Sequence, residues 1–160
     1  MSGSRGFTLL ELMWALVIIG IVMILAMPGY GRFRDSMALK QANAQILQDV
    51  RRARQLAITR HAPVVVRFGA PPSISNITSY TIHVDTNGDN VRQASEMMTV
   101  RNLPNTTRLS AVTLTPTDSL SFDTAGLLRS GTTGGRIIIA NRLNRRDTLM
   151  VSAAGVCYQP

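Results

Sequence analysis

The sequence predicts an α+β fold, in which a long N-terminal helix packs on a C-terminal antiparallel β-sheet domain. Three observations predict it. Residues 7–27 are almost entirely apolar, residues 39–57 carry apolar side chains at three- and four-residue steps, and from residue 64 onward short apolar runs alternate with turn sequences. The first two patterns are typical of helices, one membrane-spanning and one amphipathic, and the third is typical of antiparallel strands.

The apolar run is long enough to cross a membrane. Its 21 residues include one charged side chain, Glu11, and a helix of this length measures about 31 Å, close to the roughly 30 Å of a bilayer's hydrocarbon core. An acid there costs about 2.5–3.5 kcal/mol on insertion scales, so we expect Glu11 to have a partner. A secretory signal is disfavoured because residues 25–28 are a poor cleavage site, and a plain anchor gives Glu11 no role.

Five residues at fixed spacing resemble the amino terminus of type IV pilins and type II secretion pseudopilins: Gly6, Phe7, Glu11, Gly20 and Pro28. The resemblance implies that a prepilin peptidase cleaves after Gly6 and N-methylates the new terminus, Phe7. The carboxylate of Glu11 could then neutralise the new amine, in the same or a neighbouring subunit. The resemblance also implies that the helix between Gly20 and Pro28 can melt when subunits pack into a filament.

Beyond Pro28 the helix is expected to continue, with a bend, to about Thr59. It carries one apolar stripe, formed by Leu39, Ala42, Ile46, Val50, Ala53 and Ala57. The residue before Pro63 is disfavoured in a helix, so the helix should end there. The chain is thus expected to comprise a cleaved leader (1–6), a transmembrane and assembly helix (7–28), its amphipathic continuation (29–60) and a globular antiparallel β domain (61–160).

The β domain is expected to contain short strands at residues 64–68, 80–84, 97–101, 109–114, 120–122, 136–140 and 148–152. Residues 70–78 are expected to form a turn-rich loop and residues 131–136 a flexible turn. The helix stripe should pack on the inner face of the sheet. The paired strands, the Asp-x-Asn-Gly-Asp hairpin, and Leu120-Ser121-Phe122 with Gly126 four residues later resemble the GspH/FimT family of minor pilins and pseudopilins.

The hairpin also resembles a calcium-binding loop. Four oxygen-bearing residues stand at the first, third, fifth and twelfth positions of that spacing: Asp85, Asn87, Asp89 and Glu96. However, Asn90 takes the sixth position, where the sharp turn favours Gly, and no helix is expected on either side. Because Asn87-Gly88 alone predicts a type I′ turn, a plain hairpin is favoured over a weak calcium site.

The formal charge is +8, and sixteen of the seventeen basic residues are arginine, a balance that suits phosphate, acidic protein or lipid headgroups. Residues 124–146 contain no acid and carry five arginines that could contact DNA: Arg129, Arg136, Arg142, Arg145 and Arg146. It has no aromatic residue for base stacking, and it does not match the Gly-Arg-x-Arg motif of the DNA-binding members.

Neither His61 nor His83 has a neighbouring Cys or a second ligand at metal-binding spacing, and no serine lies in a nucleophile elbow. We therefore expect neither an enzyme nor a cofactor. The lone Cys157 cannot form an internal disulfide; a buried or unpaired thiol is expected, with a disulfide to a partner subunit as the alternative.

The sequence thus predicts a minor pilin or pseudopilin that helps to initiate or cap a type IV pilus or a type II secretion pseudopilus. The alternative is a filament-tip pilin that binds DNA. The resemblance implies a single-pass protein of the bacterial inner membrane with its globular domain in the periplasm. It implies as partners other pilin subunits, the prepilin peptidase and the inner-membrane assembly platform.

Overall fold

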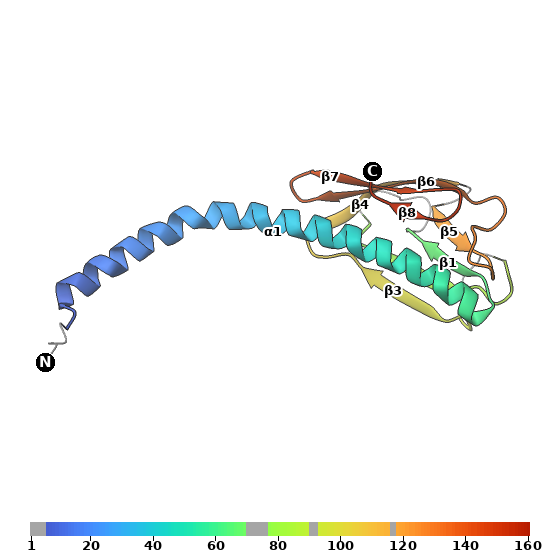
Figure 1. Ribbon diagram of the computed structural model, residues 1–160, viewed down its shortest axis with the longest axis horizontal. Coiled ribbons are helices and arrows are strands. Elements are labelled where there is room, and N and C mark those ends of the chain that lie inside the picture. The colour runs from blue at the N-terminus through green and yellow to red at the C-terminus, as the bar shows by residue number, and fades with distance from the viewer. Residues whose placement is uncertain (1–5, 70–76, 90–92, 116–117) are drawn as a thin grey trace, which may run out of the picture. The chain divides into compact units, whose positions relative to one another are not determined.

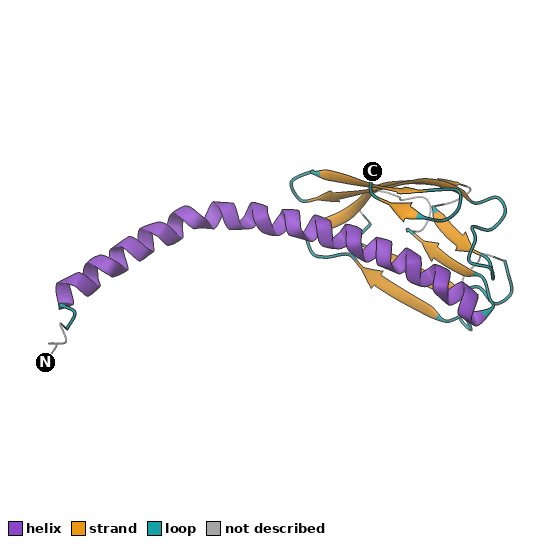
Figure 2. Ribbon diagram, viewed as in Figure 1, coloured by secondary structure: helices purple, strands orange, loops and turns teal. Residues whose placement is uncertain are grey.

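The structure, a computed structural model, describes residues 6–69, 77–89, 93–115 and 118–160. It has two compact units, one ending at Arg34 and one beginning at Asp35. A single helix is followed by short strands (Figures 1 and 2). The elements are α1 (Leu9–Arg60), β1 (Val64–Arg67), β2 (Ser79–Val84), β3 (Met98–Asn102), β4 (Thr107–Thr115), β5 (Ser119–Phe122), β6 (Thr133–Asn141), β7 (Arg146–Val151) and β8 (Cys157–Tyr158).

Helix α1 ends one residue after the position that the sequence predicts. Its last residue is Arg60, and His61 follows with a left-handed backbone (φ 49°). Pro63 comes two residues later and cannot continue the helix. The chain then enters β1 directly, so the end of the helix also fixes where the first strand begins.

The predicted apolar stripe of α1 is confirmed, because all six of its side chains are buried. They pack within the second unit against apolar side chains from both sheets. The strand residues of this core include Val64, Val66, Tyr80, Ile82, Leu120, Phe122, Ile137, Ile139, Leu149 and Val151. Aliphatic residues dominate this core, as expected for a chain in which only 5% of the residues are aromatic.

The strands form two four-stranded sheets, in the orders β3-β2-β1-β5 and β4-β6-β7-β8, and every pair is antiparallel. The predicted α+β class is therefore confirmed. The sequence did not predict the division into two sheets. It arises because β5 returns to pair with β1, while β4 pairs with β6 on the other sheet.

Strand boundaries differ most from the prediction at β6, which begins at Thr133. Gly134 and Gly135 therefore belong to the strand and not to a flexible turn. A Cβ at Gly135 would lie 1.8 Å from the carbonyl oxygen of Thr113, and one at Gly134 would lie 2.0 Å from that of Val151. The neighbouring strands approach so closely that only glycine fits. Residues 70–76 of the predicted loop lie outside the described residues.

Candidate processing and assembly site

The predicted cleavage site lies just before helix α1. Gly6 and Phe7 are both exposed and outside regular secondary structure, and 75% of Phe7 is accessible to solvent. A Cβ added to Gly6 would meet no atom within 4 Å. A peptidase would therefore meet an uncrowded, non-helical bond between these two residues.

Thr8 caps the first turn of α1. Its carbonyl oxygen accepts hydrogen bonds from the backbone N–H groups of Glu11 (3.1 Å) and Leu12 (3.2 Å), and its Oγ1 accepts a further bond from the N–H of Glu11 (3.3 Å). Thr followed three residues later by Glu is the capping-box pattern. This pattern was visible in the sequence. Glu11 therefore also stabilises the start of the helix, because a carboxylate is favoured in the first turn.

Glu11 is the one charged residue in a helical segment that is apolar on all sides. Fifteen large apolar side chains between Phe7 and Leu25 are each at least 50% exposed. A helix with this surface is normally covered by lipid or by other helices. The N-terminal part of α1 therefore has the surface of a segment that packs against other apolar groups.

Within α1, neither Leu9–Leu25 nor Gly29–Arg60 alone is long and apolar enough to cross a membrane. Only the two segments together meet the requirement, by length and composition alone. Gly20 lies in the first segment, and a Cβ added there would meet no atom within 4 Å outside the local helix backbone. Because small residues let helix backbones approach closely, another helix could pack tightly against Gly20. Pro28 lies between the two segments, within the range of α1.

The first calcium candidate, Asp85, is engaged with groups of the protein. It is fully buried, and its Oδ1 accepts a hydrogen bond from the N–H of Gly88 at 2.8 Å. Its Oδ2 lies 3.5 Å from Nη1 of Arg129, and Nη2 of Arg129 donates to the carbonyl oxygen of Gly88 at 2.8 Å. A guanidinium, which is itself a cation, therefore balances the charge of this carboxylate.

The other calcium candidates are used within the same loop. Glu96 accepts hydrogen bonds from the backbone N–H groups of Thr86 (3.1 Å) and Gln93 (3.0 Å). The side-chain amide of Asn87 donates to Asp89 at 2.9 Å. Across the part of the chain that the structure describes, no three His, Cys, Asp or Glu side chains are grouped to hold a metal ion. The arrangement is that of a loop closed by its own carboxylates.

The predicted type I′ turn at Asn87-Gly88 is wrong, although β2 and β3 do pair as neighbours. Their connection spans residues 85–97, and only Gly88 of the two turn residues has a positive φ (78°). A type I′ turn requires a positive φ at both. The physical reason is that Asp85 and Glu96 bind backbone N–H groups and so stabilise a long loop. Asn90 lies outside the described residues.

The five candidate DNA-binding arginines do not form one surface cluster. Arg129 is held by the buried carboxylate of the 85–97 loop, as described above. Arg136 is exposed within β6, whereas the other three, Arg142, Arg145 and Arg146, are exposed around the turn between β6 and β7. Arg142 follows Arg136 by six positions, which in an extended strand is a distance of about 20 Å. This arrangement does not favour the DNA-binding alternative.

Sequence reasoning missed a cluster that ties α1 to β2 and β3. Asp49, buried on α1, accepts a hydrogen bond from the hydroxyl of Tyr80 at 2.6 Å and pairs with Arg101 at 3.0 Å. One turn earlier, Nε2 of Gln45 donates to the carbonyl oxygen of Asn102 at 2.9 Å. Burial, and then the hydrogen bond to Asp49, raises the pKa of the Tyr80 hydroxyl well above its usual value. The hydroxyl therefore stays protonated as the donor.

A signal for this cluster was present in the sequence. Asp49 is next to Val50 of the apolar stripe, and an acid at such a position needs a partner. Its partners lie 31 and 52 residues further along the chain. No local pattern could have named them.

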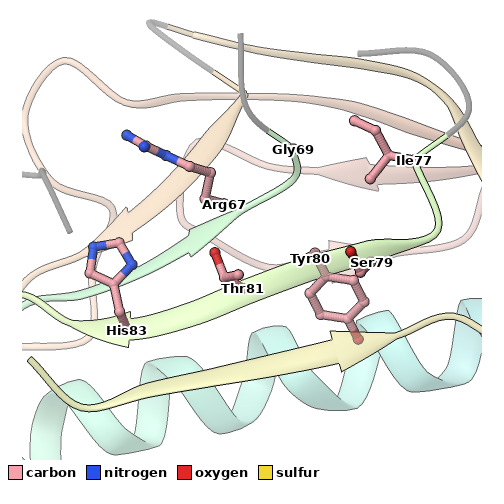
Figure 3. A pocket seen from close by; sticks show the side chains of 7 residues that line it. All are labelled: Arg67, Gly69, Ile77, Ser79, Tyr80, Thr81 and His83. Atoms are coloured by element: carbon pink, nitrogen blue, oxygen red, sulfur yellow. The ribbon is translucent and has the colours of Figure 1, made fainter. Parts of the chain in front are cut away.

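A hollow of about 380 Å³ lies beside β1 and β2 (Figure 3). Figure 3 shows Thr81 and His83 on one side of β2 and Tyr80 on the other. The hollow is next to the two ends of the 70–76 segment, which the structure does not describe. Among the described residues its lining includes one imidazole and one guanidinium but no acid or thiol: Arg67, Gly69, Ile77, Ser79, Tyr80, Thr81 and His83.

The fold and the N-terminal site together define a pilin-type subunit. The first part of its helix presents apolar side chains, and the second part packs on antiparallel sheets. Comparison with known families agrees. The chain belongs to the family described as Type II transport protein GspH, whose model matches residues 42–155, and the prokaryotic N-terminal methylation motif matches residues 1–27. These are structural subunits and not enzymes, and membership implies assembly with other pilin subunits.

Among solved structures, the chain is similar to the type IV minor pilin FimU of Pseudomonas aeruginosa. In one crystal form the identity is 15%, the TM-score is 0.56, and the match covers 80% of this chain and 92% of FimU. A second crystal form of FimU gives 16% identity and a TM-score of 0.48 over 78% and 91% of the two chains. The first likeness is one of fold. No protein of curated function matches the sequence.

Proposed function

We propose that this chain is a minor pilin or pseudopilin that is processed after Gly6 and enters a filament through its N-terminal helix. One observation carries the proposal. A helix segment that is apolar on all sides begins directly after an uncrowded Gly6–Phe7 bond, and its first turn holds one carboxylate. Neither a structural core helix nor a plain anchor requires all of these features together.

Processing changes the charge at the start of the helix. Cleavage after Gly6 leaves an amine on Phe7, four residues before Glu11 and directly before the capping residue Thr8. N-methylation keeps this amine basic. An amine and a carboxylate then stand four positions apart at the start of an otherwise apolar segment.

Charge pairing between Glu11 of one subunit and the amine of a neighbouring subunit would set how subunits dock. An unpaired charge in apolar surroundings costs several kcal/mol. A neighbouring helix that slides out of register leaves both Glu11 and the amine unpaired, whereas apolar contacts alone tolerate sliding. The carboxylate would therefore select one axial step, and the apolar side chains would supply most of the contact area.

The proposed setting is the bacterial inner membrane, with a single pass through the N-terminal helix and the β domain in the periplasm. The partners are the prepilin peptidase, the assembly platform and other pilin subunits. As a minor subunit, the chain would help to initiate or cap a type IV pilus or a type II secretion pseudopilus. The family membership and the methylation motif support this assignment.

Mass spectrometry of the membrane-extracted chain tests the processing step. In cells with an active prepilin peptidase, the N-terminal peptide should begin with N-methylated Phe7. In cells without the peptidase, which serve as the control, the chain should keep its leader. A chain that keeps its leader in both strains would overturn the proposal.

Substitutions of Glu11 test the docking step separately. Glu11→Gln removes the charge at nearly constant shape, and Glu11→Asp keeps the charge. We expect both variants to be processed, and we expect recovery in purified filaments to fall at least tenfold for Glu11→Gln but much less for Glu11→Asp. Equal recovery of the two variants would show that the charge does not direct assembly.

A further inference from the structure

The turn between β6 and β7 is held in one conformation by the buried Asn141. Its Oδ1 accepts hydrogen bonds from the N–H groups of Leu143 and Arg145, each at 3.0 Å. Its backbone exchanges further bonds of 3.0 Å with Asn144 and Arg145. Asn144 has a left-handed backbone (φ 59°), which asparagine tolerates. The side chains of residues 142–146 are therefore presented by an ordered turn, which we call the 142–146 loop.

The 142–146 loop is basic and carries an apolar side chain near its tip. Arg142, Arg145 and Arg146 are exposed, and Arg108 of β4 donates a hydrogen bond of 3.0 Å to the loop. Within the described residues none of these four arginines forms an ion pair with a carboxylate. Leu143 lies among them with 48% of its surface exposed.

The same asparagine places this loop at one end of the second unit. Nδ2 of Asn141 donates to the backbone carbonyl oxygen of Asp35 at 3.4 Å, and Asp35 is the first residue of that unit. Asp35 follows Met27, where the apolar run ends, by eight positions, so the chain between them spans at most about 28 Å even when fully extended. The loop therefore lies at the end of the second unit where the chain enters it from the apolar segment.

We propose that the 142–146 loop binds anionic phospholipid headgroups at the surface of the membrane that holds the subunit before assembly. This inference rests on the proposed function, since it takes the N-terminal helix to be in the membrane. The planar guanidinium group suits phosphate because it donates two hydrogen bonds at once. The contact would restrict the orientation of the β domain on the membrane until the subunit enters a filament.

An exposed leucine between arginines favours a lipid surface over DNA. A basic surface segment with an apolar residue can place that residue at the boundary between headgroups and acyl chains. DNA offers Leu143 no such environment, and the described part of the loop has no aromatic side chain to stack on a base. The loop therefore matches a membrane surface better than a nucleic acid.

The effect should be large enough to measure. Each basic residue near an anionic membrane surface increases binding roughly fivefold, and the attraction is lost within a Debye length. Three arginines together should raise the ratio of membrane-bound to free loop by roughly a hundredfold. High salt should lower this ratio, because it screens the attraction.

A fluorescent label on the full chain tests the inference. The label is attached at Asn105→Cys in a Cys157→Ser background, because Asn105 is exposed and lies two residues before Thr107, which pairs with Asn141. The chain is reconstituted into phosphatidylcholine vesicles with or without phosphatidylglycerol. Quenching by headgroup spin-labelled lipid reports contact with the membrane. We expect strong quenching only with phosphatidylglycerol. A control label at the exposed Ala125 should not respond, because the adjoining Gly126 packs on Ile58 near the far end of α1.

Matched variants separate a local contact from a general effect of charge. Changing Arg142, Arg145 and Arg146 to Gln should abolish the response to phosphatidylglycerol. Changing three exposed arginines of α1 should preserve it: Arg51, Arg52 and Arg60. The salt dependence of the labelled chain with all its arginines tests the same point if the loop variant does not fold.

The outcomes distinguish this inference from the proposed function. Alkaline extraction of the same vesicles reports whether the chain is inserted in the membrane. An inserted chain whose loop does not respond to phosphatidylglycerol would overturn the inference and leave the proposed function intact, whereas a chain that does not insert would overturn both. A loop that responds to duplex DNA in phosphatidylcholine vesicles, but not to phosphatidylglycerol, would also overturn it.

Discussion

Replacing Tyr80 with Phe tests how helix α1 is held on the sheet. The substitution removes only the hydroxyl group, which donates a hydrogen bond of 2.6 Å to Asp49. The side chain of Asp49 is only 4% exposed. A hydrogen bond to a charged group contributes about 1.5–3 kcal/mol. Arg101 stays paired with Asp49, but its side chain is 36% exposed, so that ion pair contributes at most about 1 kcal/mol and cannot replace the lost bond. We expect a loss of about 2 kcal/mol in the free energy of unfolding.

Thermal unfolding of the full chain in detergent, followed by circular dichroism, measures this loss. The unit Asp35–Pro160 contains 126 residues, and unfolding entropies are about 2.1 cal/mol/K per residue. A loss of about 2 kcal/mol should therefore lower its Tm by about 8 °C. The matched control is Tyr158→Phe, because Tyr158 is 47% exposed; a surface change of this kind should cost less than about 0.5 kcal/mol.

A Tyr80→Phe variant that unfolds at the same temperature as Tyr158→Phe would refute this reasoning. A second comparison isolates the bond itself. In an Asp49→Asn background the tyrosine no longer donates to a charged group, so Tyr80→Phe should cost clearly less than it does in the natural chain. Equal costs in both backgrounds would assign the loss to packing and not to the hydrogen bond.

Three further predictions follow from single residues. Gly126→Ala should lower the free energy of unfolding by about 1–3 kcal/mol, because Gly126 has φ 75° and its Cβ would lie 2.7 Å from Cδ1 of Ile58. Gly131 also has a positive φ (90°) but has open space around its Cβ, so Gly131→Ala should cost only about 1 kcal/mol for the left-handed backbone. Equal urea midpoints for Gly126→Ala and Gly131→Ala would refute the packing contribution at Gly126. Burial raises the pKa of the Cys157 thiol to about 11, so iodoacetamide should label the folded chain at pH 8 roughly a hundredfold more slowly than the unfolded chain. The stability that this thiol contributes should be intact below about pH 9 and should fall as the pH rises toward about 11, because the thiol of the unfolded chain ionises first. Urea unfolding at pH 8 and pH 10 measures this change in stability. A urea midpoint that does not depend on pH would contradict the prediction.

The burial of Cys157 also bears on its expected role. The thiol is 4% exposed and lies in the core at β8. This agrees with the expected buried thiol. A disulfide to a partner subunit would require the end of the second sheet to open.

The sequence alone determined the features that depend on local spacing. The buried stripe of α1 was predicted residue by residue, because side chains three and four positions apart always share one face of a helix. The helix end near Arg60 followed from Pro63 in the same way. The N-terminal motif was recognised from five residues at fixed spacing, and Thr8 and Glu11 form a cap whose geometry is also local.

Only the tertiary structure decided which distant groups meet. Asp85 was considered as a ligand of a weak calcium site, the less favoured alternative, because its neighbours along the chain are oxygen-bearing. The residue that balances its charge, Arg129, is 44 positions away. The same Arg129 was thereby removed from the proposed arginine surface. Gly134 and Gly135 resemble a flexible turn in sequence, but they lie where three strands approach too closely for a Cβ.

The physical reason is the range of the interactions. Helix periodicity and capping involve residues within four positions of one another, so the sequence displays them directly. The pairing of β5 with β1 and of β4 with β6 joins residues far apart in the chain. The packing of the strands on α1 and on one another decides which distant groups meet Asp49 and Asp85. The sequence therefore determined the helix and its N-terminal motif, and the strand pairing decided the two sheets, the closed 85–97 loop and the position of the 142–146 loop beside Asp35.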